Sequence, residues 1–95
     1  MPRTNDNDPP GDPITVALAA LAATLACERR AQRFIELTGI GTDELRRRAA
    51  EPALLAALLR FLEAHEPDLL DVAEALGVKP ANLVEARAQL EEGRA

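Results

Sequence analysis

The chain has 95 residues, a length typical of one domain, and 47% of them are hydrophobic although Phe34 and Phe61 are its only aromatic residues. It contains 19 Ala and 15 Leu against seven Ile and Val together, which favours helix and argues against an all-β fold or a parallel sheet. The net charge of −5 argues against a surface built for nucleic acid, the single cysteine excludes a disulfide framework, and the absence of serine excludes a serine nucleophile.

The chain begins with a polar segment that contains a Pro-Pro-Gly break. Such a segment cannot bury apolar surface, so we predict a disordered tail over residues 1–12 and one folded domain over residues 13–92.

The apolar segment Ile14–Cys27 could be a membrane span, an export signal or a buried helix. It has 14 residues, whereas a span needs about 20, and the leader before it is net negative where an export signal is positive. Asp12 and Pro13 instead form a helix start. We predict a buried helix with three leucines on its inner stripe: Leu18, Leu21 and Leu25.

Two shorter helices are predicted next. The first covers residues 28–38 and has four residues on its apolar side: Ala31, Phe34, Ile35 and Leu37. Gly39 suits the left-handed position that ends a helix. Thr42 caps a third helix over residues 43–50, whose acidic residues Asp43 and Glu44 suit the positive N-terminal end of the helix dipole.

Three prolines open the remaining helices: Pro52, Pro67 and Pro80. The helix from Pro52 to about His65 is apolar nearly all round, so we predict that it lies at the centre of the bundle. Gly77 ends the fifth helix as Gly39 ends the second. The sixth helix carries three apolar residues on one face: Leu83, Ala86 and Leu90.

The order of elements repeats, because each half of the chain contains a long helix, a short helix, a Gly-apolar stop and a further helix. This pattern indicates either two similar three-helix halves or a chance match between Ala- and Leu-rich helices. We predict an all-α, compact bundle of about five to six short helices.

The segments Arg33–Arg46 (RFIELTGIGTDELR) and Phe61–Val78 (FLEAHEPDLLDVAEALGV) resemble a bacterial family, the small helical proteins grouped as domain of unknown function 3572. The likeness extends from about Ile14 to Leu90. It implies a small, cytoplasmic, all-helical protein with no assigned activity, and it brings no catalytic or binding residue to this chain.

Positive charge is concentrated in the second and third predicted helices. Six of the eleven basic residues lie there: Arg29, Arg30, Arg33, Arg46, Arg47 and Arg48. Residues 28–48 contain four carboxylates, whereas nine acidic residues accompany four basic ones from residue 51 onward. Most charge runs merely solvate a helix face. The alternative is a charge-segregated surface for an acidic protein, RNA or a second copy of the chain, and these six arginines are its candidate partner-binding residues.

The turn between the fifth and sixth helices has the packing pattern of a helix-turn-helix. Its matching residues are Ala73, Gly77, Val78 and Leu83. Asn82, Arg87 and Gln89 would be the side chains that contact nucleic acid, but the acidic residues around them oppose binding.

Cys27 and His65, the sole thiol and imidazole, hold matching places in the two halves. A catalytic dyad would need hydrogen-bond contact and a third orienting group, which no sequence pattern supplies here. We therefore predict no catalytic residue, cofactor or metal. The expected function is a non-enzymatic, cytoplasmic interaction module that binds a protein or itself and no membrane, with a helix-turn-helix-like nucleic-acid-binding regulator as the alternative.

Overall fold

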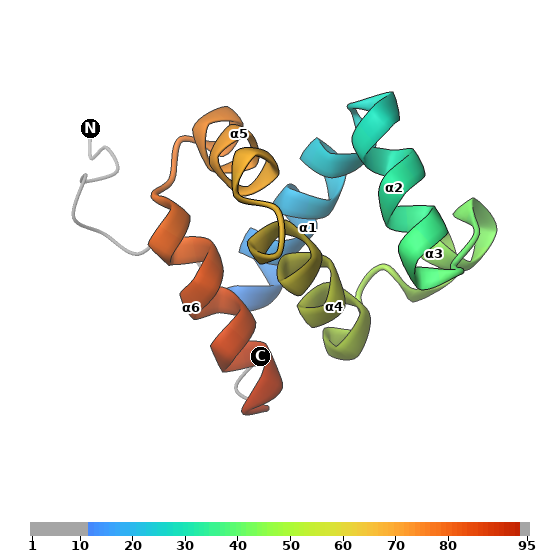
Figure 1. The fold of residues 1–95 in the computed structure, drawn as a ribbon. Coiled ribbons are helices and arrows are strands. Elements are labelled where there is room, and N and C mark those ends of the chain that lie inside the picture. The colour runs from blue at the N-terminus through green and yellow to red at the C-terminus, as the bar shows by residue number, and fades with distance from the viewer. Residues whose placement is uncertain (1–11, 94–95) are drawn as a thin grey trace, which may run out of the picture.

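A computed structural model describes residues 12–93, which form six α-helices and no strand (Figure 1). The helices are α1 (Pro13–Leu25), α2 (Glu28–Thr38), α3 (Thr42–Arg48), α4 (Pro52–Glu63), α5 (Glu66–Leu76) and α6 (Pro80–Glu91). The all-α prediction is confirmed. The predicted disordered tail falls almost entirely on residues 1–11, which lie outside the described residues. Between residues 12 and 93, no helix is long and apolar enough to cross a membrane.

The helix starts follow the local chemistry of the sequence. The Asp12 carboxylate accepts a hydrogen bond from the Thr15 backbone N–H at 2.8 Å and so caps α1. Several predicted boundaries are displaced by one or two residues. α4 ends at Glu63, so that His65 precedes α5 as its N-cap, and α5 begins at Glu66, one residue before Pro67. α3 begins at Thr42, with Gly41 and not Thr42 as its N-cap, and ends at Arg48, two residues before the predicted end.

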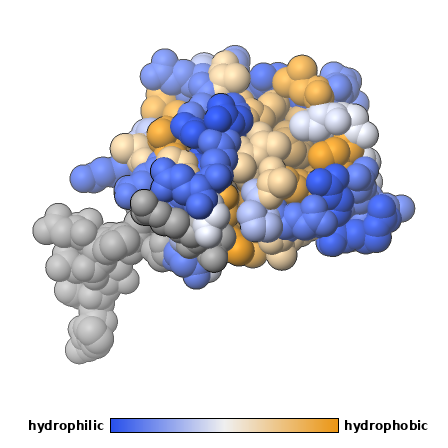
Figure 2. Space-filling view, turned by 90° about the horizontal axis from the view of Figure 1, so that it is seen from below, coloured by the Kyte–Doolittle hydropathy of each residue, from blue (hydrophilic) through white to orange (hydrophobic). Residues whose placement is uncertain are grey.

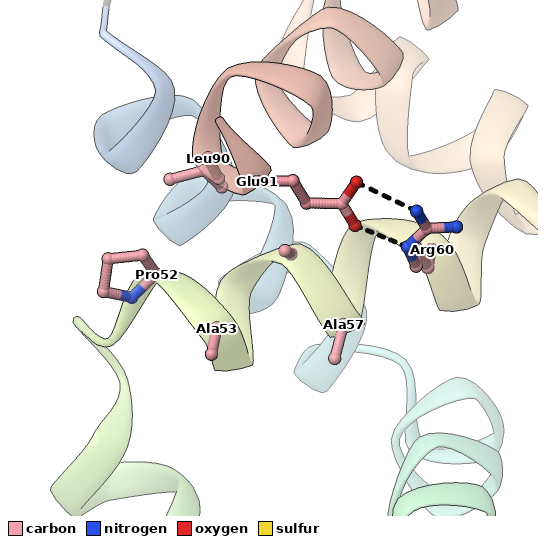
Figure 3. A pocket seen from close by; sticks show the side chains of 7 residues that line it. Pro52, Ala53, Ala57, Arg60, Leu90 and Glu91 are labelled. Carbon is pink, nitrogen blue, oxygen red and sulfur yellow. Dashed lines mark hydrogen bonds and ion pairs between the residues drawn. The ribbon is translucent and has the colours of Figure 1, made fainter. Parts of the chain in front are cut away.

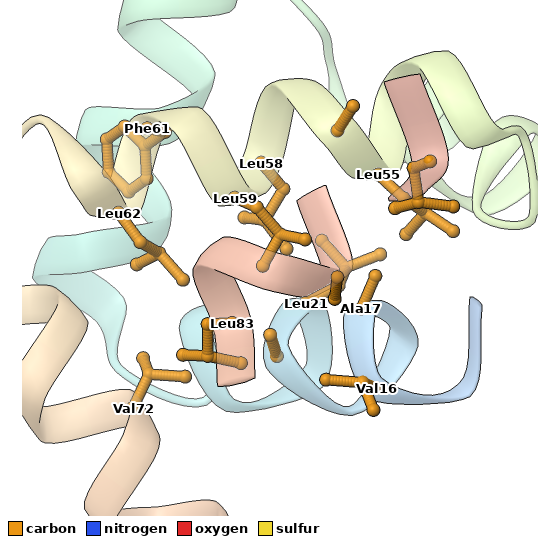
Figure 4. Packing of buried hydrophobic residues seen from close by; sticks show 14 of the residues in the cluster. Val16, Ala17, Leu21, Leu55, Leu58, Leu59, Phe61, Leu62, Val72 and Leu83 are labelled. Atoms are coloured by element: carbon orange, nitrogen blue, oxygen red, sulfur yellow. The ribbon is translucent and has the colours of Figure 1, made fainter. Parts of the chain in front are cut away.

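Helix α4 lies at the centre of the core, as its nearly all-round apolar pattern predicts. Seven of its twelve residues are buried: Leu54, Leu55, Ala56, Leu58, Leu59, Phe61 and Leu62. Figure 4 shows leucines of α4 directed towards Leu21 and Ala17 of α1 and towards Leu83 of α6. These side chains have almost no solvent exposure, so the hydrophobic effect holds the three helices together.

Four helices form a mutually packed body, and the other two are attached at one side of it. α1, α4, α5 and α6 pack against one another, whereas α2 packs along α1 and α3 makes only weak contacts with the other helices. Figure 1 shows α2 and α3 together on one side of the molecule. We call α1, α4, α5 and α6 the body, and α2 with α3 the arm.

Three leucines are not where their periodicity places them. Leu25 and Leu37 are 37% and 70% exposed, and Leu18 is only half-buried. On α1 the buried face is built instead by Val16, Ala17, Ala20, Leu21 and Thr24. Small alanines let neighbouring helices approach closely, so α1 packs through its alanines and leaves Leu25 at the edge. The predictions that Leu25 and Leu37 face the core are therefore wrong.

The two halves share an order of helices but not a way of packing. α6 packs against both α1 and α4, whereas its counterpart α3 packs along no helix of the body. The repeat is therefore one of local structure, and the tertiary structure is asymmetric.

Candidate protein-interaction surface

Two of the six candidate arginines, Arg30 and Arg33, stabilise the fold. Asp68 of α5 is 1% exposed, and Arg33 of α2 donates a hydrogen bond from Nη1 to its Oδ2 at 2.5 Å. Nε of Arg30, whose side chain is 12% exposed, lies 3.6 Å from Oδ1 of the same carboxylate. A buried carboxylate is costly without opposite charge beside it, so Arg30 and Arg33 hold Asp68 and join α2 to α5.

The same junction contains both aromatic residues. The rings of Phe34 and Phe61 lie 5.2 Å apart at an interplanar angle of 67°, an edge-to-face arrangement that joins α2 to α4. The Arg33 guanidinium lies 5.1 Å from the centre of the Phe61 ring, where its charge meets the electron-rich face. Arg33 is thus a structural residue with two partners.

Arg48 and Arg46 have ion-pair partners close to them in the sequence. Arg48 donates to Glu44 at 2.9 Å and to Glu51 at 2.8 Å, so it joins α3 to the start of α4. The hydrogen bond to Glu51, and then that to Glu44, raises the pKa of Arg48 above its usual value. Arg46 lies 3.5 Å from Asp43, but both side chains are more than four-fifths exposed, so this pair is weak.

Arg29 and Arg47 are the two arginines of this set whose side chains remain free to bind another molecule. Both are exposed, and in the part of the chain that the structure describes neither side chain has a hydrogen bond or ion pair. The free arginines of the arm are therefore Arg29 on α2 and Arg47 on α3, and Arg46 has only a weak pair. The carboxylates of Glu28 and Glu36 on α2 are exposed as well.

Cys27 and His65 occupy equivalent positions, as the N-cap residues of α2 and α5. The backbone N–H of Arg30 lowers the pKa of the Cys27 thiol, and the Arg30 charge adds to this effect. No hydrogen bond joins Cys27 to His65 among residues 12–93. Within the same residues, no group of three His, Cys, Asp or Glu side chains could hold a metal ion.

The turn at Gly77 has the predicted helix-turn-helix packing. Ala73 and Leu83 are buried, and the Val78 N–H donates to the Ala73 carbonyl at 3.0 Å. The polar side chains of α6, however, face one another and its neighbours. Arg87 binds Glu63 of α4 at 2.8 Å and Glu91 at 3.0 Å, and Gln89 donates to Glu85.

A groove of about 520 Å³ runs between α4 and α6 (Figure 3). It is lined by Pro52, Ala53, Ala56, Ala57, Leu90 and the paired Arg60 and Glu91. Seen from below, the molecule has a central band of hydrophobic side chains between hydrophilic areas (Figure 2). The polar groups of the groove bind each other, since the Arg60 guanidinium donates twice to the Glu91 carboxylate, at 2.5 and 2.9 Å.

Asp68 is the residue that sequence reasoning missed. It stands in an acidic cluster in the sequence, and its partner Arg33 is 35 residues away. A contact between residues so far apart in the sequence cannot be predicted from a local sequence pattern. The sequence offers one indirect sign: Asp68 stands one helical turn before Val72, on the row that continues the buried face of α5.

The model of one protein family matches residues 11–93, and its description is "Protein of unknown function (DUF3572)". No curated protein and no solved structure gives a significant match to the chain.

Proposed function

This chain belongs to the DUF3572 family of proteins of unknown function, and from its residues we propose that it is a non-enzymatic helical module that binds another protein. The binding residues are the free arginines of the arm, Arg29 and Arg47, and the groups that they recognise are acidic. We assign the module to the bacterial cytoplasm, in accord with its single cysteine.

The proposal rests on the observation that the Arg29 and Arg47 side chains have no carboxylate partner among the described residues. Four of the six arginines have carboxylate partners within the chain, but these two are exposed and unpaired among the described residues. A guanidinium presents a planar set of donors that matches a carboxylate, so each one is ready to bind an acidic side chain of another molecule. Leu37, 70% exposed on the same arm, supplies apolar area to such a contact.

The test is a pull-down of the tagged chain from its own host, with and without nuclease. The double variant Arg29→Glu and Arg47→Glu is compared with the wild type. Lys79→Glu is the control, because Lys79 is exposed and lies outside the arm. We expect a stoichiometric protein that survives nuclease, is captured by the wild type and by Lys79→Glu, and is lost with the double variant.

The nuclease treatment also tests the alternative, a helix-turn-helix-like nucleic-acid binder. Arg87 and Gln89 have partners within the chain, so this alternative would depend mainly on the arm. Nucleic-acid binding predicts that the captured material disappears with nuclease and that affinity falls steeply with salt. Capture that does not depend on Arg29 and Arg47 would contradict the interaction surface proposed here.

A further inference from the structure

Helix α1 is apolar on all sides, although one of its sides faces solvent. It contains no charged residue, and among the helices of residues 12–93 it is the one of which this is true. Its inner side packs against α4, α5 and α6, and Figure 4 shows Ala17 and Leu21 on that side. A helix that is apolar all round is normally buried all round. The outer side of α1 therefore lacks the polar residues that a solvent-exposed helix face usually carries.

The outer side of α1 forms one continuous strip. Its residues recur at helical spacing, opposite the buried ones, and we call them the α1 strip: Thr15, Leu18, Ala19, Ala22, Leu25 and Ala26. Five of the six are exposed, and Leu18 is half-buried. Since these residues are exposed, no helix between residues 12 and 93 covers the strip. An uncovered apolar area of this kind is typical of a contact surface.

The α1 strip matches itself in size when two copies of the helix run antiparallel. Leu18 and Ala26 each lie four residues from Ala22, on opposite sides of it, and Ala19 and Leu25 each lie three residues from it. A two-fold axis at Ala22 therefore brings each leucine of one copy to the level of an alanine of the other. Large side chains that face small ones interdigitate well, and a two-fold interface requires a surface that is complementary to itself.

The distribution of charge favours the same occupant. Each copy has a net charge of −5, so two copies repel each other wherever acidic faces meet. The residues of the α1 strip bring no like charges together, and none of them is a charged group that must lose its water. A partner selected for its charge would find no complementary group on the strip, whereas a second copy brings the same uncharged surface.

We propose that two copies of this chain pair through the α1 strip, with their α1 helices antiparallel about a two-fold axis at Ala22. Leu18 and Leu25 of each copy pack against alanines of the other, and the hydrophobic effect stabilises the contact. The contact uses neither Arg29 nor Arg47, so it is separate from the surface of the proposed function.

The pair is weak and becomes stronger with salt. α1 has 13 residues, so the strip is about 20 Å long, and at a helix diameter of about 10 Å its footprint is roughly 200 Å². A standard interface buries about 800 Å² on each partner, so this one belongs to the small, transient class. Salt screens the repulsion between the two acidic copies and leaves the apolar contact intact. Association should therefore increase from low to high salt.

Sedimentation equilibrium tests the pair, at protein concentrations from roughly 10 μM to 1 mM and at low and high salt. Ala22→Lys is the test variant and Ala75→Lys the matched control, because both alanines are exposed and lie within helices. We expect the mass of the wild type and of Ala75→Lys to rise from 10.2 kDa towards twice that value, more so at high salt. Ala22→Lys should associate at least about tenfold more weakly, because the contact would remove its charge from water.

A disulfide cross-link tests the position of the axis. A disulfide requires that the two Cβ atoms approach to about 3.5–4.5 Å, and only a residue near a two-fold axis comes so close to its own counterpart. In a Cys27→Ala background, Ala22→Cys should therefore form the covalent dimer faster under mild oxidation than Ala75→Cys. Equal rates would overturn the proposed axis.

Thermal unfolding shows whether each variant is folded, and Ala19→Lys replaces Ala22→Lys if the latter is not. A wild type that stays monomeric at roughly 1 mM would overturn the inference and leave the strip to another partner. Association that Ala22→Lys leaves unchanged, or that decreases with salt, would also overturn it. Because these variants keep Arg29 and Arg47, none of these results decides the proposed function, which the host capture tests separately.

Discussion

At the residue scale, the arginines divide by what lies opposite them. Arg30 and Arg33 meet a buried carboxylate, Arg48 meets two carboxylates of nearby turns, and Arg29 and Arg47 meet solvent. The sequence predicts that these residues are charged and clustered on two helices. It cannot predict this division, because Asp68 lies beside α2 only in the tertiary structure, where α2 and α5 both pack against α1.

Removal of the Asp68 carboxylate tests the junction between α2 and α5. Asp68→Ala leaves Nε of Arg30, a buried atom that already has no hydrogen bond, without its opposite charge. We expect a loss of about 2–3 kcal/mol in the free energy of unfolding, below the ~3–5 kcal/mol of a fully buried pair because Arg33 is one-third exposed. Urea unfolding measures the loss.

The matched control for this substitution is Asp71→Ala. Asp71 lies on the same helix but is exposed and has no ion pair among the described residues, so its loss should change stability by less than about 0.5 kcal/mol. Equal effects of the two substitutions would mean that the buried position of Asp68 does not matter.

At the element scale, the sequence predicted nearly all of the secondary structure. Asp12, Gly39, Gly77 and the prolines act within one helical turn of their own positions, so local chemistry determines where helices begin and end. The two glycine stops nevertheless differ. At Gly77 the Val78 N–H reaches back to the Ala73 carbonyl, whereas beyond Gly39 the Ile40 N–H binds the Thr38 hydroxyl at 3.2 Å. Beyond Gly39 a side-chain hydroxyl is thus the acceptor, whereas beyond Gly77 the acceptor is a backbone carbonyl. The Gly-apolar pattern that the two stops share does not show this difference.

Substitution of the glycines by alanine tests these stops. Gly77 and Gly39 have φ of +71° and +74° with open space around each added methyl group, so alanine there costs only backbone strain, about 1–2 kcal/mol. Gly41, the N-cap of α3, has φ of −80°, so Gly41→Ala brings no strain of this kind and should cost less than either of the other two substitutions. Thermal unfolding of the three variants gives the comparison. Equal losses of stability in all three variants would show that backbone strain at positive φ is not the cause.

At the scale of the whole molecule, the body is held together by contacts between helices that cannot be predicted from local sequence patterns. The sequence correctly predicts that α4 lies in the centre, because a helix that is apolar on all sides has no polar face to expose to solvent. It also suggested two equivalent halves, but α6 fills the space between α1 and α4 and α3 does not. The free surface was therefore not predictable, since it is what remains after packing.

Acid should loosen the contact between α4 and α6. The hydrogen bond from Arg60, and then that from Arg87, lowers the pKa of Glu91 below its usual value of 4.5. A carboxyl whose pKa is lower in the folded state stabilises the fold above its unfolded pKa, and this stabilisation is lost as the pH falls through the folded pKa. Glu91→Gln should therefore be less stable than the wild type at pH 6, and the difference should shrink towards pH 3.

Urea unfolding midpoints at the two pH values provide the measurement. The control is Glu85→Gln, because Glu85 lies on the same helix and, among residues 12–93, accepts a hydrogen bond only from Gln89. It should show no such dependence on pH. A difference for Glu91→Gln that stays constant down to pH 3 would contradict the role of its charge.

The separation of arm and body has a consequence for how this family can diverge. The chain leaves the body at the end of α1 and returns at the start of α4, and these two helices pack against each other. The entropy of closing such an excursion grows slowly, by about 0.6 kcal/mol for each doubling of its length. Insertions in the loops at either end of the arm and substitutions of its exposed residues are thus tolerated, whereas Arg33 and Phe34, which join α2 to the body, must be kept. The exposed residues of the arm can therefore diverge while the body and its junction with α2 stay unchanged.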